Sequence, residues 1–500
     1  MRAYVALASA LLLSACDGGG SGGGGVVTPT PTPTPAPANT APTITSATTA
    51  NFAENATGVA YQTTATDAQG DAITYTLSGT DAARFTLSAA GALSFVAAPD
   101  FEAPGDANAD NVYEVTIRAA DAGGNSQIAL RLTVTNIADQ LNVRQIASFA
   151  ERPVQVVPLP GSTRILVAEF GGKILIGDTQ GQAADFVDYT QLDVGPVFYN
   201  AQSAPFATGL SGVALAPDYA TSRKLYVAAT NAAGNWEIRR YSSRATGAPD
   251  LASEDVILRF PAGFPRLRGG WIAFGPDGYL YVTTANIDRS FDAASLTSPA
   301  GKVLRIDVNS DAYPADPNKD YAIPADNPHA ATAGALPEIF ASGLSRPSRA
   351  SFDGANLIIG DAQDGLSQPQ RVYLVRPQDA GKQFGTGAGQ IAPVIQFSLT
   401  NDLGNPTYTT LVGGIVYRGN IPSLTGKYLF AEYYSRKFWA VPAASLVPGT
   451  TLSPSSFESI NSIVVPTTPA FDARPVSFSA GSNGSLIVVF QTSAYMLEYR

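Results

Sequence analysis

One kind of strand recurs along residues 141–500 and limits most strongly how this chain can fold. Each copy is a short apolar run that follows a turn rich in Gly, Pro or Asp and ends at a polar edge. The copies occur at 165–170, 224–230, 279–285, 356–362, 427–433 and 485–491. Their spacing is irregular but within the range of propeller blades, and each run is interpreted as the penultimate strand of one blade. The pattern therefore predicts an all-β domain, a six-bladed β-propeller.

Composition supports short strands and excludes several classes of function. Charged residues make up only 14% of the chain, which contains 47 Gly and 36 Pro. With a net charge of -10 the chain is poorly suited to neutralise phosphates, so no nucleic-acid partner is expected, whereas Ca²⁺ is a suitable partner. One Cys and one His exclude an internal disulfide and a transition-metal site of His/Cys type. A Ser-His-Asp or Cys-His catalytic arrangement would have to use His329.

Residues 1–16 predict an exported, lipid-anchored protein. Arg2 precedes an apolar run from Ala3 to Leu13, which is too short to span a bilayer but fits the core of a signal peptide. The run ends in Leu-Ser-Ala-Cys16, which resembles the lipobox of bacterial lipoproteins. The resemblance implies that Cys16 is lipidated and anchors the protein in the cell envelope, on the inner or outer membrane, facing the periplasm or the exterior. A cleaved secretion signal with an incidental Cys is the alternative.

Residues 17–39 predict a tether. Its first part is a Gly/Ser run, which behaves as flexible coil, and its second part is a Thr-Pro repeat, which is extended and close to polyproline II. The expected role of this segment is to hold the following domains away from the membrane.

Residues 40–140 alternate short strands with turns, which predicts a β-sandwich. Carboxylates gather at the strand ends rather than along the strands. A sandwich brings alternate loops together at each pole, so these side chains can supply several of the roughly six to eight oxygens that Ca²⁺ takes. Turn-forming Asp residues without any metal are the alternative.

The same residues resemble the cadherin repeat. The matching stretches are Asn39–Pro42, Ala53–Asn55, Asp67–Asp71, Asp100–Glu102 and Ala120–Gly123. The resemblance implies two sets of calcium ligands, one at each pole. The set facing the next domain is Glu54, Asp100, Glu102 and Asp139, and the set facing the tether is Asp67, Asp71 and Asp121. Because a single repeat is present, the tether-side set has no neighbouring repeat to complete it.

Stretches of residues 145–500 resemble the soluble quinoprotein glucose/sorbosone dehydrogenases, which are aldose sugar dehydrogenases that use pyrroloquinoline quinone (PQQ) and Ca²⁺. The matching blocks occur in the order of that family, at 209–219, 269–286, 301–308, 337–349 and 413–433. The resemblance implies the six-bladed propeller independently of the strand pattern. It also implies a site for PQQ and a sugar at the propeller funnel.

The residues expected to carry that chemistry are altered. The family places a catalytic His before its Asn-Gly-Gly, and Leu267 stands there in this chain. Leucine cannot accept a proton, and a general base of this kind is typically worth about 10²–10⁴ in rate. The basic loop that the family places before the 413–433 block contains no Lys or Arg in residues 398–410. Asp361 and Glu432 are the remaining candidates for an alternative base.

Several polar residues remain as candidates for a funnel that accepts anions. They are Arg268, Arg346, Arg349, Gln363 and Lys382. The alternative for each is an ordinary surface or inter-blade pairing role.

Three functions therefore stay open. The first is a non-catalytic propeller that binds a carbohydrate or protein ligand at the cell surface. The second is a PQQ-dependent sugar or alcohol dehydrogenase with an altered base. The third is a structural or adhesive protein whose function lies in the cadherin-like domain.

Overall fold

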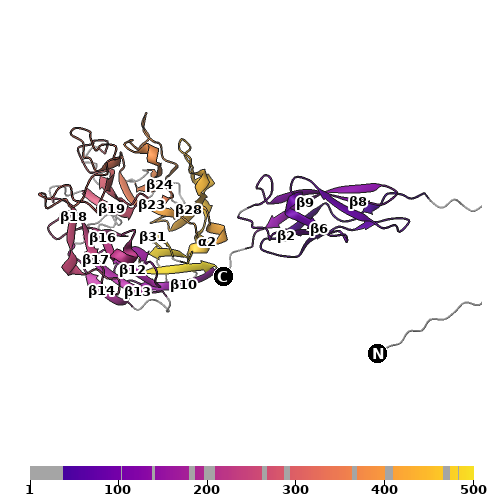
Figure 1. The fold of residues 1–500 in the computed structure, drawn as a ribbon, viewed down its shortest axis with the longest axis horizontal. Coiled ribbons are helices and arrows are strands. Elements are labelled where there is room, and N and C mark those ends of the chain that lie inside the picture. Colours follow the sequence, from indigo (N-terminus) through magenta and orange to yellow (C-terminus); the bar gives the residue numbers. More distant parts are fainter. Residues whose placement is uncertain are drawn as a thin grey trace, which may run out of the picture. The chain divides into compact units, whose positions relative to one another are not determined.

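The chain folds into two compact units, Met1–Thr135 and Asn136–Arg500, and each is described by itself (Figure 1). The boundary expected from the sequence lay a few residues later, between residues 140 and 141. The computed structural model describes 38–102, 104–137, 141–179, 186–195, 209–261, 267–286, 293–362, 369–399, 409–465, 473–481 and 483–499, without the side chains of 267–269 and 286. Cys16 and the tether before residue 38 lie outside the described residues. No helix within the described ranges combines the length and the hydropathy needed to cross a membrane.

The first unit is built from short strands in the places that the alternating pattern predicted. One sheet has the order β2-β9-β8-β5, a second has the order β3-β7-β6, and β1 pairs with β4. The strands are β1 (Thr43–Ile44), β2 (Thr49–Ala53), β3 (Val59–Gln62), β4 (Ala65–Thr66), β5 (Thr74–Ser78), β6 (Phe85–Leu87), β7 (Ala92–Phe95), β8 (Val112–Ala120) and β9 (Asn125–Thr135). Along β8 every second residue is buried, because one face of its sheet packs on the core and the other faces solvent.

The second unit contains six four-stranded antiparallel sheets, which are the blades of the propeller. Blades 1 to 3 comprise β11 (Pro153–Pro158), β12 (Arg164–Glu169), β13 (Lys173–Asp178) and β14 (Phe186–Gln191); β15 (Leu210–Leu215), β16 (Lys224–Thr230), β17 (Trp236–Ser242) and β18 (Asp255–Phe260); and β19 (Leu267–Phe274), β20 (Leu280–Asn286), β21 (Lys302–Ile306) and β22 (Ile339–Ser342). Blades 4 and 5 comprise β23 (Arg346–Asp353), β24 (Asn356–Ala362), β25 (Gln370–Val375) and β26 (Ile395–Phe397); and β27 (Leu411–Val416), β28 (Lys427–Glu432), β29 (Lys437–Pro442) and β30 (Glu458–Ser459).

The sixth blade closes the ring by joining the two ends of the unit. Its order is β31-β32-β33-β10, so that β10 (Leu141–Ser148) pairs with β33 (Ser493–Tyr499) beside β31 (Pro475–Ala480) and β32 (Leu486–Phe490). Two short helices, α1 (Tyr219–Ser222) and α2 (Asn461–Val464), lie in the connections. The six-bladed propeller predicted from the recurring strand is confirmed.

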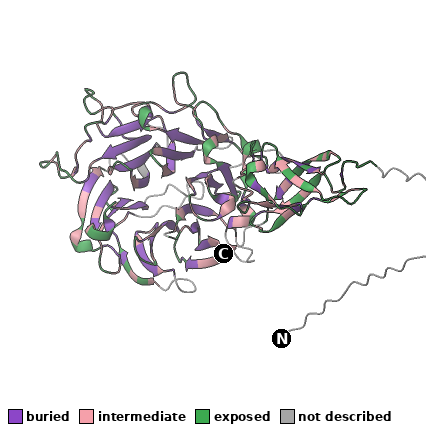
Figure 2. Cartoon of the chain, turned by 45° about the vertical axis from the view of Figure 1, so that its right-hand side comes forward, coloured by how far each residue is buried: buried purple, intermediate pink, exposed green. Residues whose placement is uncertain are grey.

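The recurring apolar runs are the second strands from the axis, and not the penultimate ones as expected. In β12 all residues after Arg164 are buried, and β32 is buried throughout. Each blade is packed on both faces, because one apolar cluster fills each space between neighbouring blades. Figure 2 shows buried residues following the propeller strands and exposed residues concentrated in the connections. A strand buried on both faces reads as a continuous apolar run, which explains the signal in the sequence.

The innermost strands form a closed ring around a central channel. Going round the ring, β11, β15, β19, β23, β27 and β31 each contact the next, and β31 contacts β11. Each blade has four antiparallel strands, so all six innermost strands begin at the same end of the channel. That end is called the mouth below, and the other end is called the far face.

Candidate functional site

A hollow lies in the channel just inside the mouth, and all six blades line it. Its walls come from the first residues of the innermost strands, including Val154, Leu210, Leu411 and Val476. Gly270 is required where β19 approaches β23, because a Cβ there would lie 2.5 Å from the carbonyl oxygen of Pro347. The hollow is therefore a cup with a mixed polar and apolar lining, formed where the innermost strands meet.

Arginines supply most of the charge around this cup. Arg152 directly precedes β11 and Arg474 precedes β31, and their guanidinium carbons lie 5.3 Å and 5.9 Å from the centre of the Tyr433 ring. Cations at such distances from an aromatic face are attracted by the ring quadrupole. Arg152 and Tyr433 both line the cup.

Arg349 crosses the channel. Its side chain starts on β23 in blade 4, and its Nη2 donates a hydrogen bond of 2.7 Å to the carbonyl oxygen of Val154 on β11 in blade 1. Its Nη1 donates to the carbonyl oxygen of Ser348 at 3.0 Å. Blades 1 and 4 are opposite one another in a ring of six, so the guanidinium lies across the channel axis and forms part of the cup.

Three buried carboxylates occupy equivalent places near the mouth ends of second strands. They are Glu169 on β12, Asp361 on β24 and Glu432 on β28. Asp361 accepts hydrogen bonds from the backbone N–H groups of Ser345 at 2.9 Å and Arg346 at 2.6 Å. Glu432 accepts one from the backbone N–H of Thr410 at 2.7 Å. These carboxylates attach the segment that leads into the innermost strand to the body of the blade.

Glu169 has a polar environment of the same kind. The backbone N–H of Glu151 donates to its carboxylate, yet burial and then the negative charge of Glu151 raise its pKa above the usual value. The pattern of one strand-end carboxylate receiving an N–H from the incoming segment therefore occurs in blades 1, 4 and 5.

The other residues predicted for the funnel are dispersed. Arg346 is buried at the start of β23. Lys382 lies beside the outermost strand of blade 3, where its Nζ is 3.2 Å from Asp379 Oδ1, and it does not line the cup. Leu267 and Arg268 open β19 at the mouth, where only their backbone is described. Gln363 lies outside the described residues.

His329 is remote from the mouth. It belongs to the connection between β21 and β22, which leaves blade 3 at the far face. Its Nε2 is buried without a hydrogen-bond partner near Gly381, and burial lowers its pKa from the usual value. A His-based catalytic arrangement at the mouth is therefore not formed by the histidine of this chain.

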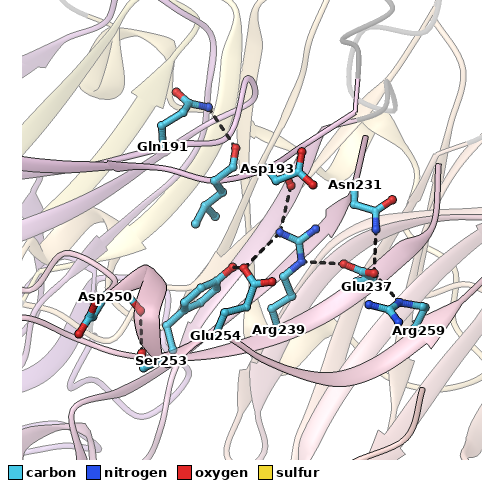
Figure 3. Close-up of polar contacts among 11 residues, drawn as sticks. Gln191, Asp193, Asn231, Glu237, Arg239, Asp250, Ser253, Glu254 and Arg259 are labelled. Atoms are coloured by element: carbon cyan, nitrogen blue, oxygen red, sulfur yellow. Dashed lines mark hydrogen bonds and ion pairs between the residues drawn. The ribbon is translucent and has the colours of Figure 1, made fainter. Parts of the chain in front are cut away.

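Blade 2 contains a buried ion network that the sequence analysis missed (Figure 3). Glu237 on β17 binds the Nε atoms of Arg239 at 2.7 Å and Arg259 at 2.5 Å, and it accepts a hydrogen bond from Asn231 at 2.8 Å. Arg239 also donates to the carbonyl oxygen of Asp193 at 3.0 Å. The network attaches the segment leaving blade 1 to blade 2. Its signal in the sequence was a pair of opposite charges two residues apart, which share one face of a strand.

In the first unit, the sandwich, the carboxylates lie in the two groups that were expected from the sequence. Glu54, Asp100 and Glu102 each place an oxygen within 4.8 Å of the others. Glu54 is only 2% exposed and accepts a hydrogen bond from the backbone N–H of Phe101 at 3.1 Å. Asp139, the fourth member expected in this group, lies outside the described residues.

The second group is formed by Asp67, Asp71 and Asp121, whose oxygens also lie within 4.8 Å of one another. Asp67 Oδ1 accepts hydrogen bonds from the backbone N–H groups of Asp71 and Gln69, both at 2.9 Å. These bonds, the one from Asp71 first, lower the pKa of Asp67, which keeps it ionised. Both groups offer only oxygen ligands, which is the donor chemistry that Ca²⁺ takes.

Residues 150–361 match the family model described as Glucose / Sorbosone dehydrogenase. This part of the propeller therefore resembles the glucose/sorbosone dehydrogenases. Two solved structures have the same fold, the PQQ-bound aldose sugar dehydrogenase of Streptomyces coelicolor (TM-score 0.51, 20% identity, 72% of this chain and 99% of that chain) and the apo-form soluble aldose sugar dehydrogenase of Escherichia coli (TM-score 0.53, 16% identity, 72% and 100%).

Curated relatives match parts of this chain. Hedgehog-interacting protein of Mus musculus is 26% identical over 318 residues, which is 58% of this chain and 42% of that protein. HIPL2 protein of Arabidopsis thaliana is 29% identical over 230 residues, or 40% of this chain and 33% of that protein. The chain thus spans about two fifths or less of the length of these relatives. The name of the Mus musculus protein includes an interaction partner, whereas the titles of the two solved structures describe dehydrogenases.

The described mouth of the propeller fits PQQ only in part. Arg349 offers a cation to a ligand carboxylate. Leu267 stands where the family places its base, and the Asp361 and Glu432 carboxylates accept backbone N–H groups. The described cations of the mouth therefore suit an anionic group of a ligand.

Proposed function

We propose that this chain is a lipoprotein of the bacterial cell envelope, anchored through Cys16, whose propeller binds a carbohydrate or protein ligand at its mouth without oxidising it. The cadherin-like sandwich binds Ca²⁺ through the two carboxylate groups and acts as a spacer between the anchor and the propeller. The propeller keeps the fold of the dehydrogenases but binds its ligand instead of oxidising it.

The observation that carries the proposal is the state of the acidic and basic groups at the mouth. A sugar dehydrogenase needs a group that takes the hydroxyl proton, held within hydrogen-bond reach of the substrate. Position 267 is Leu, and the Asp361 carboxylate points into its own blade, where two backbone N–H groups donate to it. Among the described residues, the mouth offers a cup with a mixed polar and apolar lining that includes the cations Arg152 and Arg349, a combination suited to binding.

A PQQ-dependent dehydrogenase with an altered base is the second candidate. It is favoured by the likeness to two solved aldose sugar dehydrogenases, one of them with PQQ bound, and by the arginines around Tyr433. Under this alternative Asp361 or Glu432 would act as the base while it also accepts backbone hydrogen bonds.

One assay separates the two. The purified full chain is mixed with PQQ and Ca²⁺, and aldose-dependent dye reduction is compared with that of Asp361→Asn and Leu267→His variants. The proposal expects no turnover by the wild-type chain. Turnover by the wild-type chain that the Asp361→Asn change abolishes would show that the propeller is an enzyme. Turnover that appears only in Leu267→His would support the proposal, since it would identify the lost base as the missing component.

A further inference from the structure

The guanidinium of Arg349 is partly buried, and the described residues offer it no balancing carboxylate. Its two hydrogen-bond partners are the carbonyl oxygens of Val154 and Ser348, and its Nε has no partner. No ion pair to Arg349 occurs among the residues that the structure describes. By contrast, the buried Arg239 and Arg305 each bind carboxylates, those of Glu237 and Asp277 among them. Arg349 therefore differs from Arg239 and Arg305 in having no carboxylate partner among the described residues.

A second cation adds to this charge rather than reducing it. Burial and then the nearby Arg152 lower the pKa of Arg349 to about 10, so the guanidinium stays charged at neutral pH. An isolated buried charge is costly unless an ion of opposite sign and further hydrogen bonds compensate it. The positive charge of Arg349 is thus not compensated by the described residues, and an anion bound in the cup would balance it.

The shape of the cup limits what this anion can be. Arg349 lies across the axis, and the walls are the first residues of all six innermost strands. Only a small group at the end of a ligand can enter so narrow a ring. The rest of that ligand would lie toward the mouth, where Arg152 and Tyr433 line the cup.

We propose that the cup binds the carboxylate of an acidic saccharide, with Arg349 as the residue that recognises it. This inference rests on the proposed function, because it names the ligand class of the same site. A saccharide is favoured over an acidic peptide because the cup admits a single thin group and because the fold is shared with proteins that act on aldose sugars. Arg349 is thereby a binding residue and not a catalytic one.

The test measures the melting temperature of the propeller in the full chain at constant ionic strength, with glucuronate, glucose or acetate as the probe. We expect glucuronate to raise the melting temperature with concentration, and glucose and acetate to have little effect. The Arg349→Gln variant, which can still donate to a carbonyl oxygen, should weaken glucuronate binding by at least about tenfold. Arg418→Gln is the control, because Arg418 pairs with Asp353 on the surface and its loss should leave the response unchanged.

The outcomes are distinct. An equal response to glucose, an equal response to acetate, or a glucuronate response that persists in Arg349→Gln would each overturn the inference. If Arg349→Gln does not fold, Arg349→Lys takes its place. This variant keeps the positive charge but loses the guanidinium fork that reaches Val154, so its binding of glucuronate should still weaken. Failure of all probes together with absence of PQQ turnover would overturn only the acidic saccharide, whereas turnover would overturn the proposed function itself.

Discussion

At the scale of single residues, variants of Asp361 distinguish a structural role of this side chain from a catalytic one. Its carboxylate accepts the N–H groups of Ser345 and Arg346, which would be buried without partners if the side chain were removed. We expect Asp361→Ala to lower the free energy of unfolding by about 2–4 kcal/mol. Asp361→Asn, which keeps one oxygen acceptor, should cost less. Urea unfolding of the two variants measures the difference.

Asp353→Ala serves as the control for this prediction, because Asp353 lies on the innermost strand of the same blade and pairs with the exposed Arg418. Its removal should cost only about 0–1 kcal/mol. If Asp361→Ala and Asp353→Ala lower the free energy of unfolding equally, the structural role assigned to Asp361 is contradicted. Asp361 would then again be a candidate for the base.

His329 gives the propeller a pH dependence of known sign. Burial lowers the pKa of His329 below its ordinary value of 6.5. The unfolded chain therefore takes up a proton first as the pH falls through 6.5, and stability is lost between that pH and the lower pKa of the folded state. We expect the free energy of unfolding to fall from pH 7.5 to about 5.5 in the wild-type chain and to fall less in His329→Gln. Parallel pH profiles would show that the imidazole is not desolvated.

At the scale of elements, blade 2 depends on its buried ions. Glu237 is 1% exposed and binds two guanidinium groups, so Glu237→Gln leaves the buried Arg239 only the more distant and more exposed carboxylate of Glu254. Breaking such a pair costs about 3–5 kcal/mol. Glu458→Gln is the matched change, because it removes an exposed ion pair with Lys427 and should cost at most about 1 kcal/mol. Calorimetry of both variants checks the prediction, and similar melting temperatures would contradict it.

The elements also show how far the sequence could predict the molecule. The blades were predictable because each second strand, such as β12, is buried on both faces and so leaves a continuous apolar run. The carboxylate groups followed from the resemblance to the cadherin repeat, which assigned each residue to a pole. Arg349 was among the residues expected at the funnel, but its contact with Val154 could not be predicted, because it joins strands 195 residues apart and exists only when the ring is closed.

At the scale of the whole molecule, the chain consists of two compact units with separate cores. A ligand that binds one unit is therefore expected to stabilise that unit alone. Ca²⁺ should act on the sandwich, because both carboxylate groups belong to it, and it should leave the melting of the propeller unchanged. Calorimetry of the full chain in Ca²⁺ and in EDTA resolves the two transitions.

The size of the calcium effect follows from its affinity. At a concentration about one hundred times the dissociation constant, binding to the folded state alone adds about 2.7 kcal/mol. Glu54→Gln should remove much of this gain, because Glu54 is the buried member of its group, whereas Glu114→Gln should not, because Glu114 forms an exposed pair with Arg131 on β8 and β9. A sandwich that melts at the same temperature in Ca²⁺ and in EDTA would show that its carboxylates only form turns. A gain that survives Glu54→Gln but is lost in Asp67→Asn would instead assign the ion to the other pole.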